Sequence, residues 1–359
     1  MKKRALVTAL TMALTVIPLA VPSVVNAANP VLTVDLASNT GNVLYGATGF
    51  LYGLGNDGVP SDNMLAPLKI QYASQKPPGG LQHPNGDTLE VKDAFFRNGG
   101  KYIQVIMQDI YKQWPYENLG INDYLTKVDT IVTKLKADSY HDSYVYVPFN
   151  EPNWIWYNNS TKLQSFFNDW KTVYQRIRSI DPSAKIGGIN WSYYDANVYD
   201  QFLTFAKANN CLPDVTTWHE LDNSFFTSWQ DHYNHYRGVE TRLGISPRPI
   251  SINEYGRINS DIPVPGNLVQ FVSKFENSKV YGSLAYWTTA GALNDLVTEN
   301  NKATGGWWLY KLYADMTGHT VKVTPPSPSG SLQGVASLND TDKQARILFG
   351  GSANSADVT

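Results

Sequence analysis

Short runs of β-forming apolar residues alternate with longer amphipathic patterns over about 280 residues, and this alternation constrains the fold more strongly than any other feature of the chain. Several runs are almost continuously apolar, as expected of strands buried on both faces of a parallel sheet. The eight predicted strands cover residues 44–52, 68–73, 102–107, 144–149, 184–190, 215–218, 249–253 and 281–287. Their order predicts a parallel sheet with helices outside it.

The segments between these strands repeat apolar residues at steps of three and one, which places them on one face of an α-helix. The pattern is clearest over residues 121–135 and 163–177, and Ser160 or Thr161 is expected to cap the second of these helices. The other predicted helices cover residues 88–97, 197–208, 231–243, 268–275 and 303–316. Eight β-α units favour a closed (β/α)8 TIM barrel over an open doubly wound sheet. The sequence contains neither a dinucleotide fingerprint after the first strand nor a P-loop.

The N-terminus has the pattern of a secretory signal peptide over residues 1–27. Lys2, Lys3 and Arg4 precede an apolar run, which ends in small residues at Ala27. A retained membrane anchor is the weaker interpretation. Because no later stretch has the roughly 18 consecutive apolar residues of a spanning helix, we expect a secreted, extracellular protein that has no membrane contact after cleavage.

Two further segments lie outside the predicted barrel, which is expected over residues 41–320. Residues 28–40 form an N-terminal strand. Residues 321–359 form a Pro-rich linker and a partial, truncated β-domain of the sandwich type, with a hairpin over 333–338 and 344–349. Two strands alone are marginally stable. Either the sequence is a piece of a longer protein or the hairpin joins the N-terminal strand, and both can hold.

Composition narrows the class of partner. The formal net charge is −2, and loss of the three basic residues at the N-terminus makes it −5, which argues against a nucleic-acid or anionic-membrane partner. Cys211 is the single cysteine, so no intrachain disulfide can form, and we expect it to be a packed thiol. The 10 Trp, 22 Tyr and 13 Phe residues are typical both of proteins that stack on sugars and of aromatic cores.

An Asn-Glu pair follows two of the predicted strands. Asn150-Glu151 ends the fourth strand and Asn253-Glu254 ends the seventh. Active sites of β/α barrels lie at the carboxyl ends of the strands, and strands four and seven face each other across the barrel. Two carboxyl groups about 5–5.5 Å apart can cleave a glycosidic bond with retention, one as acid and one as nucleophile. The alternative for either glutamate alone is an ordinary salt bridge.

This barrel, with Asn150-Glu151-Pro152 after strand four and Glu254 after strand seven, resembles the clan A glycoside hydrolases, and most of all glycoside hydrolase family 39, over residues 40–318. The resemblance implies that Glu151 is the general acid/base and that Glu254 is the nucleophile. It also implies that Asn150 binds the sugar 2-hydroxyl. One departure is Leu221, where the family often has an aromatic residue two places after the histidine of strand six.

Further candidates for substrate binding lie at other strand ends. They are His219 and Glu220 after strand six, Trp287 after strand eight, Trp191 after strand five, Trp154 after the acid/base, and His83 in the loop after strand two. The aromatic rings among them stack on sugars or pack between loops. No zinc-ligand spacing occurs, so we expect no metal and no cofactor, a carbohydrate as the partner, and no protein partner.

The sequence therefore predicts a secreted retaining glycoside hydrolase. It is expected to cleave O-glycosidic bonds of an extracellular or plant cell-wall polysaccharide or oligosaccharide by double displacement. An inverting enzyme or a transglycosylase on the same fold is one alternative. A non-catalytic carbohydrate-binding or cell-surface protein on a TIM-barrel scaffold is another, although that reading predicts loss of one carboxylate and both are present.

Overall fold

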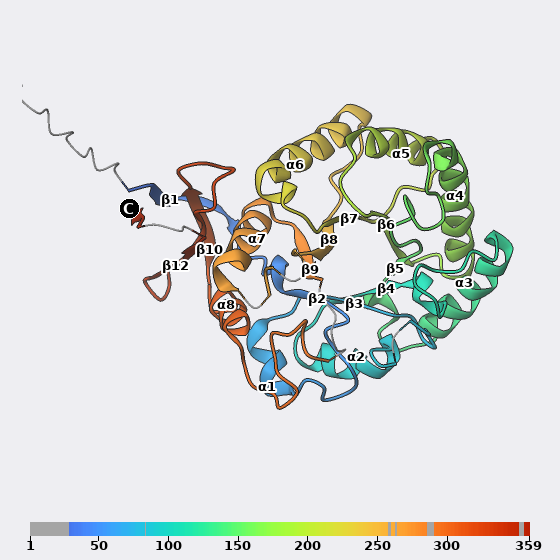
Figure 1. Ribbon diagram of the computed structural model, residues 1–359, viewed down its shortest axis with the longest axis horizontal. Coiled ribbons are helices and arrows are strands. Elements are labelled where there is room, and N and C mark those ends of the chain that lie inside the picture. Colours follow the sequence, from blue (N-terminus) through green and yellow to red (C-terminus); the bar gives the residue numbers. More distant parts are fainter. Residues whose placement is uncertain (1–28, 83, 258–259, 263, 286–290, 352–354) are drawn as a thin grey trace, which may run out of the picture.

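The computed structural model describes residues 29–82, 84–257, 260–262, 264–285, 291–351 and 355–359. Its larger part is a closed barrel of eight parallel strands, which confirms the predicted TIM barrel (Figure 1). The strands are β2 (Gly49–Leu51), β3 (Tyr72–Gln75), β4 (Tyr102–Ile106), β5 (Tyr144–Val147), β6 (Lys185–Trp191), β7 (Val215–Glu220), β8 (Ile250–Tyr255) and β9 (Tyr281–Leu284).

Helices surround the barrel and cover the outer face of its strands (Figure 1). They are α1 (Asp62–Leu65), α2 (Thr88–Arg97), α3 (Ile121–Lys136), α4 (Leu163–Ile180), α5 (Ala196–Ala208), α6 (Ser224–Leu243), α7 (Pro265–Ser278) and α8 (Gly305–Ala314). Short 3-10 turns connect several of these elements, namely η1 (Gly46–Thr48), η2 (Ala66–Leu68), η3 (Met107–Ile110), η4 (His141–Ser143) and η5 (Ser160–Lys162). The apolar face of each long helix packs on the strands.

Four sequence-based predictions about where elements begin were wrong. The first two strands begin later than expected, because Thr48 and Leu68 belong to 3-10 turns and are buried there without being part of the sheet. Burial, and not strand pairing, explains the apolar character of these segments. Neither Ser160 nor Thr161 caps α4, because its N-cap residue is Lys162, and Asn159 caps the preceding η5 by accepting a hydrogen bond from the backbone N–H of Thr161. Helix α6 begins at Ser224, about two turns before the predicted start at residue 231.

The barrel interior is partly polar. Gln104 of β4 donates a hydrogen bond to Ser251 of β8 at 2.6 Å. Ser74 of β3 and Ser283 of β9 lie 3.1 Å apart, oxygen to oxygen. Neither pair joins neighbouring strands, so both contacts cross the interior. They satisfy polar groups that burial alone would destabilise.

Both ends of the described chain contribute to a second, five-stranded sheet beside the barrel (Figure 1). Its order is β12-β11-β10-β1-β13, with β1 (Val31–Asn42) antiparallel to β10 (His319–Thr324) and parallel to β13 (Asp357–Val358). Strands β11 (Gln333–Asn339) and β12 (Gln344–Gly350) form a hairpin in full register. This hairpin lies against α7, which places the sheet on the side of the barrel and away from the strand ends.

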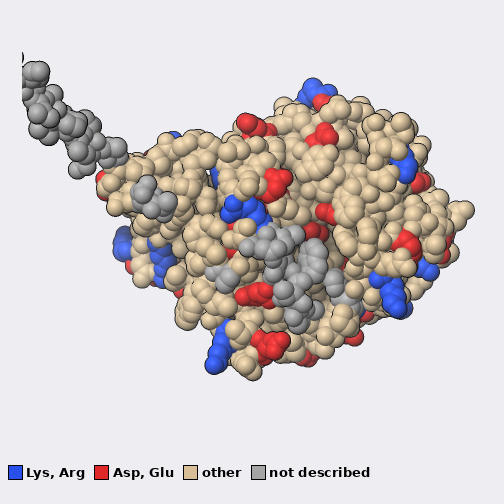
Figure 2. All heavy atoms as spheres, in the orientation of Figure 1, with Lys and Arg blue, Asp and Glu red and all other residues tan. Residues whose placement is uncertain are grey.

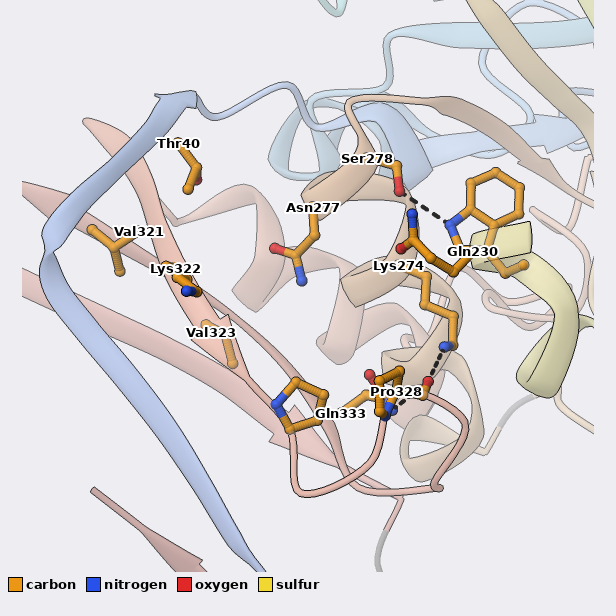
Figure 3. Close-up of a pocket in the computed structure, with 12 residues that line it drawn as sticks. Thr40, Gln230, Lys274, Asn277, Ser278, Val321, Lys322, Val323, Pro328 and Gln333 are labelled. Atoms are coloured by element: carbon orange, nitrogen blue, oxygen red, sulfur yellow. Dashed lines mark hydrogen bonds between the residues drawn. The ribbon is translucent and has the colours of Figure 1, made fainter. Parts of the chain in front are cut away.

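A cavity of about 320 Å³ separates this sheet from helices α6 and α7 (Figure 3). Lys274 of α7 lies in it and donates a hydrogen bond to the Pro328 carbonyl at 2.7 Å. Burial lowers the pKa of Lys274 to about 8. Trp229 of α6 donates to Ser278 at the cavity's inner end. The described residues that line this cavity include no carboxylate.

The signal peptide predicted over residues 1–27 lies outside the described residues. Within the described part of the chain, none of the helices combines the length and apolar character needed to cross a bilayer. Acidic and basic side chains are scattered over the visible face and do not gather by sign (Figure 2). Cys211 is buried, as expected, and its carbonyl accepts a hydrogen bond from the Trp170 indole.

Candidate active site

The two predicted glutamates lie at the carboxyl ends of β5 and β8. Glu151 lies in the loop after β5, and Glu254 is the second-last residue of β8. The two residues are 7% and 5% exposed. The backbone of Glu151 has a φ of 46°, which is uncommon for a residue with a Cβ. Its N–H donates to the carbonyl of Asn190 at the end of β6. Strained backbone of this kind is enriched at functional sites, where the surroundings hold it in place.

An irregularity in β8 sets the position of Glu254. Trp218 of β7 pairs with Ile252, but the next residue, His219, pairs with Glu254, so Asn253 is an extra residue in the ladder. A bulge of this kind re-aims the following side chain. It brings Glu254 into register with His219. The side chain of Asn253 is buried, and neither of its polar atoms has a hydrogen-bond partner among the described residues.

His219 lies between the two carboxylates. Its Nδ1 is 3.1 Å from Glu151 Oε1, and its Nε2 is 3.6 Å from Glu254 Oε1. Within this group, one oxygen of each glutamate lies within 4.8 Å of the other and of the imidazole. Trp154 donates from its indole N–H to the second oxygen of Glu151 at 2.8 Å. The structure thus brings four of the predicted site residues into direct contact.

The electrostatics of this cluster follow from its burial. Burial raises the pKa of Glu254 to about 8, an effect that His219 opposes and that Glu151 and Asp109 reinforce. Burial alone would lower the pKa of His219, but the neighbouring glutamates raise it above its usual value. A proton can pass between His219 Nδ1 and Glu151 Oε1, since they are within hydrogen-bond distance.

Asn150 is held from three sides. Its backbone N–H donates to Gln108 Oε1 at 2.7 Å, and its Oδ1 accepts a hydrogen bond from Asn190 at 2.6 Å. Its Nδ2 donates to the Tyr116 hydroxyl at 3.4 Å. Asn150 is 2% exposed and directly precedes Glu151. One Nδ2 proton is used by Tyr116, and the other is available to a bound group.

Sequence reasoning missed a buried carboxylate beside this cluster. Asp109, in η3 after β4, is fully buried and accepts hydrogen bonds from the hydroxyls of Tyr52 (2.5 Å) and Tyr116 (2.6 Å). Burial raises the pKa of Asp109 to about 7, and the two tyrosines and Lys76 oppose that rise. The available signal was its place directly after a predicted strand, where barrel enzymes carry functional groups.

Glu220, predicted to bind substrate, is 3% exposed and has structural partners. Its Oε1 accepts hydrogen bonds from the Trp218 indole and lies 2.8 Å from His232 Nδ1. A cavity of about 160 Å³ extends from His219 past Glu220 to Ser224. Ser192 also lines it, and this residue contacts the segment after Glu151. Glu220 thus stands at the wall of a polar cavity that His219 also lines.

The predicted aromatic contacts divide between rim and core. Trp154 is 41% exposed, and its ring meets that of the equally exposed Trp114 edge-on, with centroids 5.7 Å apart. Trp191 is 5% exposed and packs on Phe166 in the core. It does not stand at the rim. Trp287 and His83 lie outside the described residues.

Glu151, His219 and Glu254 are also a group whose geometry could hold a metal ion. Two carboxylates and an imidazole are a common donor set for divalent metals. The two glutamates also form a carboxylate pair, in which Trp154 donates a hydrogen bond to Glu151, and the amide of Asn150, which accepts from Asn190, directly precedes Glu151 in the chain. That pair suits acid–base and nucleophilic chemistry at a carbon centre.

An eight-stranded β/α barrel with two buried glutamates at opposing strand ends defines a clan A glycoside hydrolase-like TIM barrel. A family 39 glycoside hydrolase from Xanthomonas axonopodis pv. citri shares this fold, with a TM-score of 0.60 at 16% identity over 89% of this chain and 76% of its own. N2152 from Neocallimastix frontalis superposes with a TM-score of 0.82 at 32% identity, over 90% of this chain and 82% of its own. The chain belongs to the same family as N2152.

Two curated relatives are similar over nearly the whole chain. A 3-O-β-L-arabinopyranosyl-α-L-arabinofuranosidase from Bifidobacterium pseudocatenulatum is 38% identical over 91% of this chain, and a 3-O-α-D-galactosyl-α-L-arabinofuranosidase from Bifidobacterium longum subsp. longum is 37% identical over 93%. The chain spans 39% and 34% of the length of these relatives. No family model matches the sequence.

Proposed function

We propose that this chain is a retaining glycoside hydrolase of family 39 type, with Glu151 as acid/base and Glu254 as nucleophile. The observation that carries the proposal is the carboxylate spacing: one oxygen of each glutamate lies within 4.8 Å of the other. Retaining enzymes have carboxyl groups about 5–5.5 Å apart, whereas inverting enzymes need about 6.5–9.5 Å to admit a water molecule. The spacing therefore favours double displacement over direct attack by water.

In the first step, Glu254 attacks the anomeric carbon while the glycosidic C–O bond breaks. The bonding electrons go to the leaving oxygen, which takes the proton of Glu151. His219 lies 3.1 Å from Glu151 and stabilises the carboxylate that remains. Asn150 offers its second Nδ2 proton to the hydroxyl beside the reacting carbon, because Tyr116 takes the first.

In the second step, Glu151 removes a proton from water and the hydroxyl attacks the same carbon. The ester bond to Glu254 breaks and restores its carboxylate. Glu151 then acts as a base, which matches its two roles in one cycle.

The proposed substrate class is a plant glycan with α-L-arabinofuranosyl units that carry a sugar at O3. This proposal comes from the names of the two curated relatives, both of which are arabinofuranosidases for 3-O-substituted units. The polar cavity beside Glu220 and the exposed rings of Trp154 and Trp114 supply surfaces for more than one sugar. We also propose export from the cell, since residues 1–27 have a signal-peptide pattern and plant polysaccharides are extracellular.

The test is hydrolysis of 4-nitrophenyl α-L-arabinofuranoside and of 3-O-substituted arabinofuranosyl oligosaccharides by the full chain. Glu151→Gln should lower kcat/KM by about 10²- to 10⁴-fold on unactivated substrates. Glu254→Gln should lower it on every substrate. Azide should rescue Glu151→Gln on an activated aryl substrate by attacking the glycosyl-enzyme, which gives a glycosyl azide with the anomeric configuration of the substrate. Glu90→Gln, on the exposed face of α2, is the matched control and should leave kcat/KM unchanged.

Product analysis separates the alternatives. Proton NMR of the first-formed sugar should show the anomer of the substrate, and the opposite anomer would exclude retention. A chelator should not change the rate if no metal takes part. Binding of the oligosaccharides without hydrolysis would instead favour a carbohydrate-binding protein on this scaffold.

A further inference from the structure

Asp109 is a buried carboxylate that the proposed catalytic steps do not use. It is 0% exposed, and its two oxygens accept hydrogen bonds from different tyrosines, Tyr52 and Tyr116. These residues come from the ends of different barrel strands or the loops after them. Asp109 also lies close enough to Glu254 to raise its pKa. A carboxylate in such a place needs a reason, because its burial is costly.

The hydrogen bonds that start at Asp109 have a fixed direction. The hydroxyls of Tyr52 and Tyr116 both donate to Asp109, so the single hydroxyl proton of Tyr116 is used in that bond. The Tyr116 oxygen must then accept from Asn150, which turns Nδ2 of Asn150 towards Tyr116. Oδ1 of Asn150 consequently faces the amide of Asn190, which donates to it at 2.6 Å.

Asp109 thus determines which end of the Asn150 amide carries the donor. We propose that Asp109 is a positioning residue that sets the orientation of Asn150 through Tyr116, and so selects substrates with a hydroxyl beside the cleaved bond. This inference rests on the proposed function, in which Asn150 binds that hydroxyl. Gln108, next to Asp109 in η3, reinforces the arrangement by accepting from the Asn150 backbone N–H.

Replacement of the carboxylate by an amide reverses the direction. In Asp109→Asn, the new amide group can donate a hydrogen bond to the Tyr116 oxygen. The Tyr116 hydroxyl then no longer donates to residue 109 and can donate to the Asn150 side chain instead. The Asn150 amide then presents its oxygen to Tyr116 and loses its orientation towards the sugar. The same loss follows from Tyr116→Phe, which removes the intermediate hydroxyl and keeps the ring.

The experiment combines a substitution in the enzyme with removal of one hydroxyl from the substrate, as in a double-mutant cycle, and uses the full chain. Hydrolysis of an aryl α-L-arabinofuranoside and of its 2-deoxy analogue is measured for wild type, Asp109→Asn and Tyr116→Phe. On the parent substrate we expect kcat/KM to fall about 10- to 100-fold, the scale of one unsatisfied hydrogen bond in a closed site. On the 2-deoxy analogue we expect the same substitutions to change kcat/KM less than about threefold, because the hydroxyl that Asn150 binds is absent.

The matched control is Asp123→Asn, which changes a carboxylate that also accepts from a tyrosine hydroxyl, that of Tyr111 at 2.8 Å. Asp123→Asn should leave kcat/KM unchanged on both substrates. Equal losses on both substrates would mean that Asp109 acts only by holding the fold, and would overturn the inference. If Asp109→Asn does not fold, as judged by circular dichroism, Tyr116→Phe decides between these outcomes.

Failure of the proposed function gives a different result. A wild type that cleaves neither glycoside refutes the hydrolase proposal, and a crystal structure of Asp109→Asn at atomic resolution then decides the inference. Reorientation of the Asn150 and Asn190 amides supports it. Unchanged amides in that structure overturn it.

Discussion

Replacement of His219 by glutamine should move the acidic limb of the pH–rate profile to higher pH. His219 Nε2 lies 3.6 Å from Glu254 Oε1, and unit charges at that distance interact by about 4–5 kcal/mol at an effective dielectric constant of 20. Since one pKa unit corresponds to about 1.4 kcal/mol, full loss of this interaction sets a ceiling of roughly three units. Because the imidazole also interacts with Glu151, we expect the acidic limb to move by about one to two pH units.

The sign follows from the identity of the groups. A cation stabilises the carboxylate of Glu254, whose pKa is already raised to about 8 by burial. Without the cation, Glu254 stays protonated to higher pH, so the carboxylate that acts as nucleophile forms only at higher pH. The assay is kcat/KM for an aryl glycoside between pH 4 and 10, since this quantity reports ionisation in the free enzyme.

His141→Gln is the matched control. His141 lies in η4, before β5 begins, at the end of the barrel opposite Glu151. Its profile should coincide with that of the wild type. An acidic limb of His219→Gln that stays in place, or moves to lower pH, would refute the idea that the imidazole supports ionisation of the nucleophile.

Three further predictions concern stability and reactivity. The folded-state pKa of Glu254 is raised from 4.5 to about 8, so its ionisation destabilises the fold as pH rises through that window; Glu254→Gln should gain up to about 4 kcal/mol over wild type between pH 5 and pH 8 in urea titrations. Gly188→Ala should cost at least about 1–3 kcal/mol, since a Cβ there would lie 2.2 Å from the Trp170 ring, whereas Gly238→Ala in α6 meets no atom within 4 Å and should stabilise the helix. Burial raises the pKa of the Cys211 thiol to about 11, so a thiol reagent should label it in urea but not in the native protein, and rapid native labelling would contradict its packing.

The barrel was predictable from sequence because its strands are buried on both faces. In the sequence, such strands are continuous apolar runs, whereas the helices between them repeat apolar residues with the period of an α-helix. The same logic failed at the first two strands. Leu68 is fully buried, but in a 3-10 turn, and an apolar residue reports burial and not the type of backbone that carries it. Trp191, for which the sequence left sugar contact and packing both open, packs on Phe166, because a large ring at a strand end serves the core as readily as a ligand.

The two glutamates were identifiable because each follows an apolar strand directly. Asp109 was not, because its hydrogen bonds connect residues that are 57 positions apart in one case and 7 in the other. No local pattern encodes such contacts. Only the closed barrel brings the strand ends together, and only side-chain positions show which donor faces which acceptor.

The likeness of the two Asn-Glu pairs is itself misleading, since the asparagines have opposite environments. Asn150 has partners for its backbone N–H and for both side-chain polar atoms. Asn253 has none for its side chain among the described residues, and it is the extra residue of the β8 bulge. Asn150 thus orients a donor beside the acid, whereas Asn253 shifts the ladder so that Glu254 meets His219. An identical dipeptide therefore acts through its side chain at one strand end and through the backbone at the other.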